Sequence, residues 1–320
     1  MKRFYLVISL GLSFSLTGCS LLSTMINKFN EPKFKEKGSL VDRNTFMEEY
    51  DKAFNNVVYY DNEHINSFTA KSTYIESYKS FRKNKNNKTV KNYNYKEKRS
   101  INTKYSKENV LWQSYEYNDS SDYKTQTEKS NDSYISKEDV QLQIEDNDIY
   151  RFDNIEKKYA SIIQNNATQT LDDNAKTFFW RHLVWITDFF NSYTDTDYYI
   201  NNRIFTIVQN ESVERDIIDK IYDPGTGTTT EIIVGTRSFV FKRTIQFNFT
   251  PGKFSYQFSY KNKRIEKFTK NTTQEREGDI STSTEEEKHV STFDFNEPKG
   301  LKKKSISNYE KIDSINYYGY

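Results

Sequence analysis

Hydrophobic and polar residues alternate along most of the chain, as expected for β-strands with one buried face. The clearest case lies on both sides of Pro251-Gly252, where large apolar side chains occupy every second position. This pair is typical of a tight turn, so it sets the register of a hairpin. The predicted cross-strand pairs are Phe249 with Phe254, Phe247 with Tyr256, and Ile245 with Phe258.

Two further stretches carry the same alternation. Residues 65–162 contain several such segments, separated by clusters of Asn, Asp, Lys and Ser that are typical of turns. Strands resume at Tyr198, with a turn predicted at residues 223–227. Residues 270–288 are polar with little periodicity, which favours a solvated hairpin end or a loop. The pattern predicts antiparallel strands with one face in water.

Helical spacing interrupts the alternation twice. Apolar residues recur every three or four positions over residues 42–60, where Thr45 and Glu48 fit a capping box. A second helix, rich in Phe and Trp, is expected to begin at Asp172 and to continue to about Tyr193. The sequence therefore predicts an α+β fold in which a large curved antiparallel sheet packs against two main helices.

The N-terminus has a different pattern. Lys2 and Arg3 precede an apolar run that ends at Leu16. This is the layout of a secretory signal peptide, and the run is shorter than the ~20 residues of a membrane-spanning helix. We expect residues 1–18 to be a cleaved leader.

The end of this leader, Leu16-Thr17-Gly18-Cys19, resembles the lipobox of bacterial lipoproteins. That resemblance implies a diacylglyceryl group on Cys19 and cleavage between Gly18 and Cys19. It also implies a protein anchored by lipid, palmitate included, to the extracytoplasmic face of the cell membrane. The alternative is an unmodified cysteine after an ordinary leader. We expect residues 19–41 to be the lipidated tether, 42–298 a single domain, and 299–320 a polar tail.

Composition and motifs exclude several classes of function. The 47 basic and 45 acidic residues nearly balance, so no basic field indicates binding of nucleic acid. None of the three histidines has the spacing of a zinc site, and no serine lies in a Gly-x-Ser-x-Gly motif. We therefore predict no catalytic residue, no metal site and no cofactor, and expect a protein that is not an enzyme.

Aromatic side chains supply the remaining candidate site. They make up 16% of the residues, whereas all hydrophobic residues make up 35%. One interpretation is a cavity between sheet and helices that binds a lipid or another apolar ligand. The alternative is a solid core, in which His182 is simply a buried histidine. The predicted lining residues are His182, Phe179, Phe247, Phe249, Tyr256 and Phe258.

The order of helix, strands, aromatic helix and further strands behind a lipid anchor resembles the LolA/LppX half-barrel of lipid-carrying lipoproteins. This resemblance rests on element order over residues 42–298 and implies a space for acyl chains beneath the sheet. A second interpretation is a surface-displayed structural or interaction lipoprotein with a solid aromatic core. The sequence does not identify its protein partner.

Replacement of Cys19 tests the anchor. Cys19→Ser removes the thiol that would receive lipid, so we expect the protein to appear in the medium or to remain unprocessed. Fractionation of cells and the mass of the mature N-terminus measure both outcomes. A Cys19→Ser protein that stays in the membrane after cleavage at the same bond would show that another segment holds it there.

Overall fold

The computed structural model describes residues 33–162, 166–183, 196–272 and 275–313. Residues Met1–Lys33 and residues Phe34–Tyr320 form two separate units. Every helix and strand described below belongs to the second unit.

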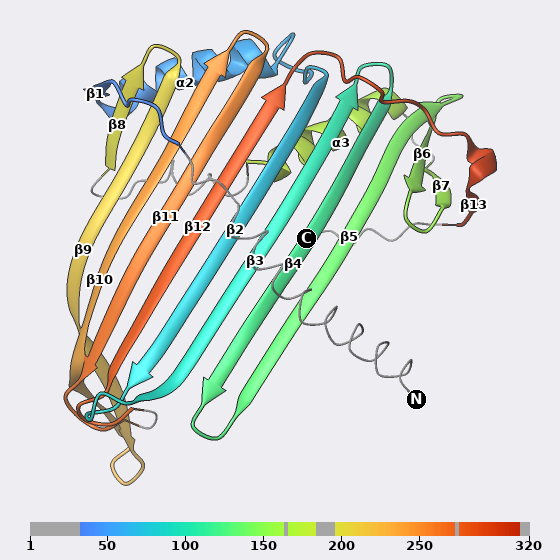
Figure 1. Ribbon diagram of the computed structural model, residues 1–320. Helices are drawn as coiled ribbons and strands as arrows, with labels where there is room; N and C mark the ends of the chain where they lie inside the picture. Colours follow the sequence, from blue (N-terminus) through green and yellow to red (C-terminus); the bar gives the residue numbers. More distant parts are fainter. Residues whose placement is uncertain (1–32, 163–165, 184–195, 273–274, 314–320) are drawn as a thin grey trace, which may run out of the picture. The chain divides into compact units, whose positions relative to one another are not determined.

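Thirteen strands form one sheet within the described residues (Figure 1). Neighbouring strands are antiparallel, except that β13 runs parallel to β7. Their order across the sheet is β1 (Ser39–Val41), β8 (Thr196–Asn201), β9 (Ile204–Asp223), β10 (Thr228–Thr250), β11 (Lys253–Phe268), β12 (Ile280–Asp294), β2 (Phe68–Lys83), β3 (Thr89–Ser106), β4 (Val110–Thr125), β5 (Lys129–Glu145), β6 (Asp148–Asp153), β7 (Lys158–Ile162) and β13 (Glu310–Lys311).

The predicted α+β class was wrong, because strands hold 62% of the described residues and helices only 13%. The cause is strand length. β10 alone has 23 residues, whereas strands of 5–6 residues are most common. The sequence pattern separates residues 109–117 from residues 121–127, but residues 110–125 form one strand, β4. The polar residues 280–288 belong to β12.

Two α-helices lie within the described residues. In α2 (Arg43–Val58), Asp42 is the N-cap, and its carboxylate accepts hydrogen bonds from Thr45 N at 3.0 Å and Thr45 Oγ1 at 2.6 Å. The capping role predicted for Thr45 was therefore wrong. The second helix, α3 (Ala167–Arg181), begins five residues before the predicted start and is capped by Asn166. Its predicted continuation beyond Leu183 lies outside the described residues.

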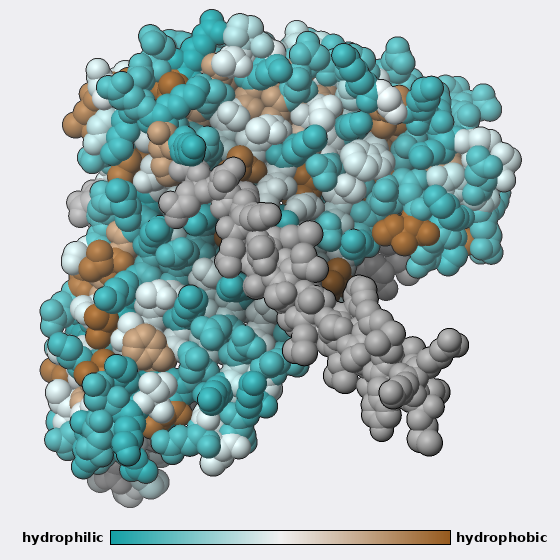
Figure 2. Space-filling view, viewed as in Figure 1, coloured by the Kyte–Doolittle hydropathy of each residue, from teal (hydrophilic) through white to brown (hydrophobic). Residues whose placement is uncertain are grey.

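Both helices pack on the same face of the sheet, near one end of the long strands (Figure 1). α2 contacts β8, β10 and β11, and α3 contacts β3, β4, β5 and β6. The other face is largely hydrophilic, with scattered hydrophobic residues (Figure 2). A 3-10 helix (Ile306–Asn308) precedes β13.

The register of the hairpin β10–β11 confirms the pairs predicted from alternation. Phe249 lies opposite Phe254, Phe247 opposite Tyr256, and Ile245 opposite Phe258. The alternation fixes this register because a shift by one residue would turn the aromatic side chains toward water. These residues are buried, as are Phe46, Tyr50 and Phe54 of α2 and Phe178 and Phe179 of α3.

A β-bulge interrupts β10 at Val234, near the N-terminal end of the strand. The pairing with β9 skips Val234, since Ile233 pairs with Ile218 and Gly235 with Ile217. Val234 is 1% exposed, and its carbonyl accepts hydrogen bonds from Thr269 N and Lys270 N. A Cβ atom at Gly235 would overlap the backbone carbonyl of Lys267 on β11.

Gly235→Ala is expected to lower the free energy of unfolding by about 1–3 kcal/mol, since the added methyl group forces two strand backbones apart. Urea denaturation measures the effect, with Thr236→Ala as a control on the same strand. Equal stability of the two variants would show that the strands separate here without cost.

Candidate functional site

The six predicted lining residues lie together between the sheet and the helices. Phe247 and Phe249 come from β10, and Tyr256 and Phe258 from β11. Phe179 lies on α3, and His182 is the C-cap residue of that helix. None of the six is more than 3% exposed. The structure thus brings together all six residues that the sequence pattern selects.

These side chains contact other aromatic rings across the interface. The Phe249 ring centroid lies 4.8 Å from that of Phe254, and Phe179 lies 4.9 Å from Phe293. From α2, the Tyr50 ring lies 4.9 Å from Phe247 and 5.6 Å from Phe249. Such spacings are those of packed aromatic pairs. Binding of an apolar ligand by these residues remains a prediction.

His182 and its neighbour Arg181 connect the end of α3 to β2, β3 and β4. Its Nδ1 lies 2.6 Å from Ser72 Oγ on β2, and its Nε2 lies 2.8 Å from Thr103 Oγ1 on β3. On β4, Gln113 donates from Nε2 to Thr103 Oγ1 and accepts from Arg181 at Oε1. Both ring nitrogens of His182 therefore have partners, which is what a buried polar side chain requires.

A second histidine continues this network. His289 on β12 has ring nitrogens within 3.2 Å of the Tyr256 hydroxyl, and its Nε2 lies 3.0 Å from Ser291 Oγ. The Tyr256 hydroxyl donates to the backbone carbonyl of His182, and Ser291 Oγ lies 2.5 Å from Ser72 Oγ. The polar chain thus runs from β11 to β4 beneath the end of α3.

Burial keeps both histidines neutral. It lowers the pKa of His182 to about 3, with a smaller contribution from the positive charge of Arg181. Burial likewise lowers the pKa of His289 to about 3, and the neighbouring His182 adds to this effect. The Ser72–His182 pair resembles a nucleophile and base, but Ser72 is only 5% exposed and His182 is fully buried. The pair therefore lacks access for a substrate and stabilises the docked helix.

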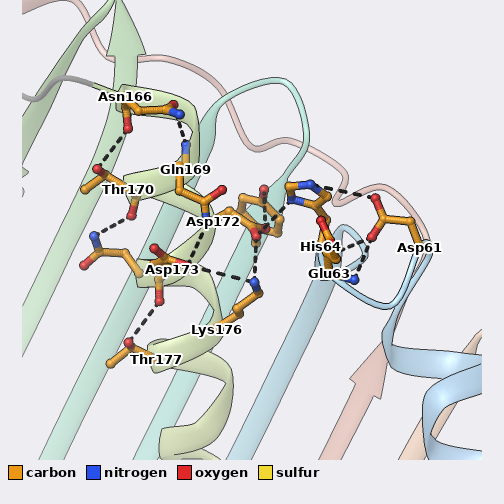
Figure 3. A network of polar contacts seen from close by, with 12 residues as sticks. Asp61, Glu63, His64, Asn166, Gln169, Thr170, Asp172, Asp173, Lys176 and Thr177 are labelled. Atoms are coloured by element: carbon orange, nitrogen blue, oxygen red, sulfur yellow. Dashed lines mark hydrogen bonds and ion pairs between the residues drawn. The ribbon is translucent and has the colours of Figure 1, made fainter.

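Asp172 attaches the N-terminal half of α3 to the rest of the unit (Figure 3). Its carboxylate lies 3.2 Å from Lys176 Nζ and 3.3 Å from His64 Nδ1, and it accepts a hydrogen bond from the Tyr105 hydroxyl. Asp172 is 3% exposed, so these contacts compensate a charge that burial would otherwise destabilise.

A row of carboxylates crosses the same face of the sheet. It begins at Glu287, two residues before His289 on β12. Glu287 on β12 lies opposite Glu76 on β2, Glu76 opposite Glu97 on β3, and Glu97 opposite Asp119 on β4. Like charges directly opposite each other destabilise a sheet. Here a tyrosine two residues earlier on the same strand donates to each of the last three: Tyr74 to Glu76, Tyr95 to Glu97 and Tyr117 to Asp119.

Burial and neighbouring carboxylates change the acidity of Glu287 and Glu76. Burial raises the pKa of Glu287 to about 7, and the negative charges of Glu285 and Glu76 raise it further. Burial also raises the pKa of Glu76. Arg99 Nε donates a hydrogen bond to Glu97, which is 3% exposed. Glu287 is therefore the member of the row whose protonation changes near neutral pH.

The sequence analysis missed this row. The available signal was a repeated Tyr-x-acid pattern at residues 74–76, 95–97 and 117–119. A single pattern of this kind is common on a solvated strand. Only the register of β2, β3 and β4 shows that the three copies lie side by side.

Within the described ranges, no group of three or more His, Cys, Asp or Glu side chains has an arrangement that holds a metal ion. No helix in that part of the chain is long and apolar enough to cross a membrane. Gly18 and Cys19 lie outside the described residues.

Comparisons with known proteins identify no family. No protein-family model matches the chain, and no curated protein matches its sequence. Among solved structures, the Escherichia coli outer membrane protease OmpT shares 8% identity over 71% of this chain and 96% of its own, with a TM-score of 0.24. The β domain of the Bordetella autotransporter BrkA shares 8% identity over 70% and 98%, with a TM-score of 0.20.

A Pseudomonas aeruginosa FadL homologue is similar at 9% identity over 76% of this chain and 94% of its own, with a TM-score of 0.15. TM-scores this low do not define a common fold.

His289→Gln tests whether His289 is neutral in the folded protein. Its pKa is lower in the folded than in the unfolded protein, so stability is lost as the pH falls from about 6.5 toward 3. Each such histidine contributes about 1.4 kcal/mol per pH unit to this slope. We expect the variant to have a shallower slope between pH 6 and pH 4, measured by urea denaturation.

The slope of the variant must be compared with that of the wild type, because Glu287 changes stability in the opposite direction as the pH falls. Its raised pKa makes the folded protein bind a proton first as the pH falls below about 7. That contribution is present in both proteins. Equal slopes for wild type and His289→Gln would show that His289 is protonated in the folded state.

Proposed function

We propose that this chain is a non-enzymatic lipoprotein, anchored through lipid on Cys19 to the extracytoplasmic face of a bacterial cell membrane. Its folded unit would present a polar sheet to the surroundings, held together by a solid aromatic core. Its role would be contact with a partner and not transport of an apolar cargo.

The anchor is supported by the leader. An apolar run too short to span a membrane ends in Leu16-Thr17-Gly18-Cys19, and Cys19 is the sole cysteine of the chain. Without a second cysteine, no intramolecular disulfide can form. The folded unit must therefore be stabilised by burial, which agrees with its dense aromatic interior.

Close ring contacts between the sheet and the helices are the observation that carries the proposal. Side chains expected to line an apolar cavity lie instead in ring contact with α2, α3 and one another. A residue that lines a ligand cavity faces the ligand, whereas Phe249 faces Tyr50, Phe205 and Phe254 at centroid distances of 5.6, 5.6 and 4.8 Å.

A non-enzymatic role is supported by the buried state of the polar network. Its hydroxyl groups and both histidines lie beneath α3, where they satisfy one another. The resemblance to LolA/LppX carriers stays a prediction, since no family model matches the chain.

Phe249→Ala distinguishes a solid core from a lipid cavity. In a solid core the lost ring leaves a void, and the free energy of unfolding should fall by about 3–5 kcal/mol. In a cavity the change should cost little stability and should alter the amount of bound lipid. Thermal unfolding and mass spectrometry of lipid co-purified with the same protein measure both quantities.

Phe241→Ala is the matched control, because Phe241 lies on the same strand and face but is only partly buried. It should cost distinctly less stability than Phe249→Ala. Stoichiometric lipid in the wild type, together with a stable Phe249→Ala variant that carries less lipid, would contradict the solid core and support a carrier.

A further inference from the structure

The outer edge of β9 has a partner strand over only part of its length among the described residues. β8 pairs with β9 only from Ile204 to Gln209. Within the described part of the chain, no strand pairs with the outer edge of residues 210–223, although β10 pairs with their inner edge. The outward N–H and C=O groups of this segment are therefore available for another strand.

This edge carries charged side chains that limit non-specific pairing, but it lacks a proline and a bulge. Residues 210–223 contain no proline, a single lysine and several exposed apolar side chains. Ile218 and Ile221 are 54% and 51% exposed. The bulge at Val234 lies on β10, so β9 itself stays regular across this stretch. An edge with these properties is a template for strand addition.

The segment is complementary to itself in one antiparallel register. A two-fold axis perpendicular to the sheet, centred on Ile217, places each residue opposite a residue of the same face in a second copy. In this register Arg215 lies opposite Asp219 of the second copy, and Glu214 lies opposite its Lys220. The symmetry repeats both pairs, which gives four pairs of opposite charge.

Apolar residues match in the same register. Val213 lies opposite Ile221 of the second copy, and Ile217 lies opposite its own equivalent. These positions share the face that carries the helices, so the contact would continue the apolar part of that face. Cross-strand apolar and opposite-charge pairs each stabilise a sheet by about 0.2–1 kcal/mol.

Neighbouring registers are less favourable. Centring on Asp216 or on Asp219 places an aspartate opposite itself, and centring on Arg215 places Glu214 opposite Asp216. Centring on Ile218 places Ile217 opposite Asp219 and Arg215 opposite Ile221. Centring on Ile218 or on Asp219 gives one kind of opposite-charge pair each, Asp216 with Lys220 or Arg215 with Asp223. The register centred on Ile217 gives two kinds, together with two kinds of matched apolar pair, the largest number among these five.

The charged side chains are available for these contacts. Glu214, Arg215 and Lys220 are all exposed. Lys220 Nζ lies 3.0 Å from Glu231 on β10, and the side chains of this pair are 70% and 56% exposed. Glu214 of a second copy would lie on the other side of Lys220. Glu214, Lys220 and Glu231 would then form a row of alternating charge across three strands.

We propose that two copies of this chain associate through the outer edges of β9, antiparallel and centred on Ile217. The sheet then continues across the two-fold axis, with the helices of both copies on the same side. The inference goes beyond the proposed display function and does not depend on the lipid anchor or on the nature of the core.

A charge exchange tests this interface. The full chain, purified in mild detergent, is compared with Arg215→Asp, Asp219→Arg and the double variant by size-exclusion chromatography with light scattering. The wild type is expected at twice the mass of the processed chain, after subtraction of bound detergent. Each single variant should weaken association at least tenfold, and the double variant should restore it because the pairs are exchanged.

Lys242→Asp is the control, since it changes the charge of an exposed residue on β10 away from the edge. Thermal unfolding of each variant shows whether the fold is kept. A monomeric wild type would overturn the proposal. So would a dimer that responds equally to Lys242→Asp, or one that the single edge variants leave intact.

Disulfide trapping tests the register. Ile217→Cys, made with Cys19→Ser so that it carries the sole thiol, places two thiols opposite each other at the axis. Directly opposed residues are close enough for a disulfide. Ser212→Cys in the same background lies opposite Tyr222 of the second copy and should not cross-link. Equal cross-linking of both variants would contradict this register.

Discussion

The packing of two short helices against one end of one sheet face determines this fold. Long strands with alternating side chains would otherwise expose their apolar face to water. α2 and α3 cover that face with Phe46, Tyr50, Phe54, Phe178 and Phe179. Each buried aromatic residue removes about 150–250 Å² from water, so a few large rings replace many aliphatic residues. The rest of the sheet extends from this covered end.

Polar groups inside the same interface determine where α3 lies. Apolar contacts alone tolerate small shifts of a helix along a sheet, whereas hydrogen bonds require fixed positions. His182 has partners on β2 and β3 at its two ring nitrogens, and outside α3 Asp172 has partners on β3 and in the loop before β2. A shift of α3 would leave these buried groups unsatisfied, at a cost of about 1–3 kcal/mol for each.

The sequence pattern predicted the features that depend on local periodicity. The register around Pro251-Gly252 was correct because alternation and the turn pair agree there. The length of β4 could not be predicted, since polar residues such as Asn118 and Asp119 resemble a turn until a partner strand is known. The cap at Asp42 was missed because Thr45 and Glu48 fit a capping box by spacing alone. The carboxylate row depends on strand register, which a single sequence does not specify.

The order of the strands has a consequence for how the chain folds. The ladder between β12 and β2 joins the two halves of the sheet, and its paired residues are roughly 200 positions apart in the sequence. Contacts of such separation form slowly, because the intervening chain must first be restricted. During synthesis, β2 exists long before β12, so its edge stays open until the C-terminal strands emerge. We expect the joining of β12 to β2 to be the late step of folding, and the interval before it to be the period when chaperones protect the chain from aggregation.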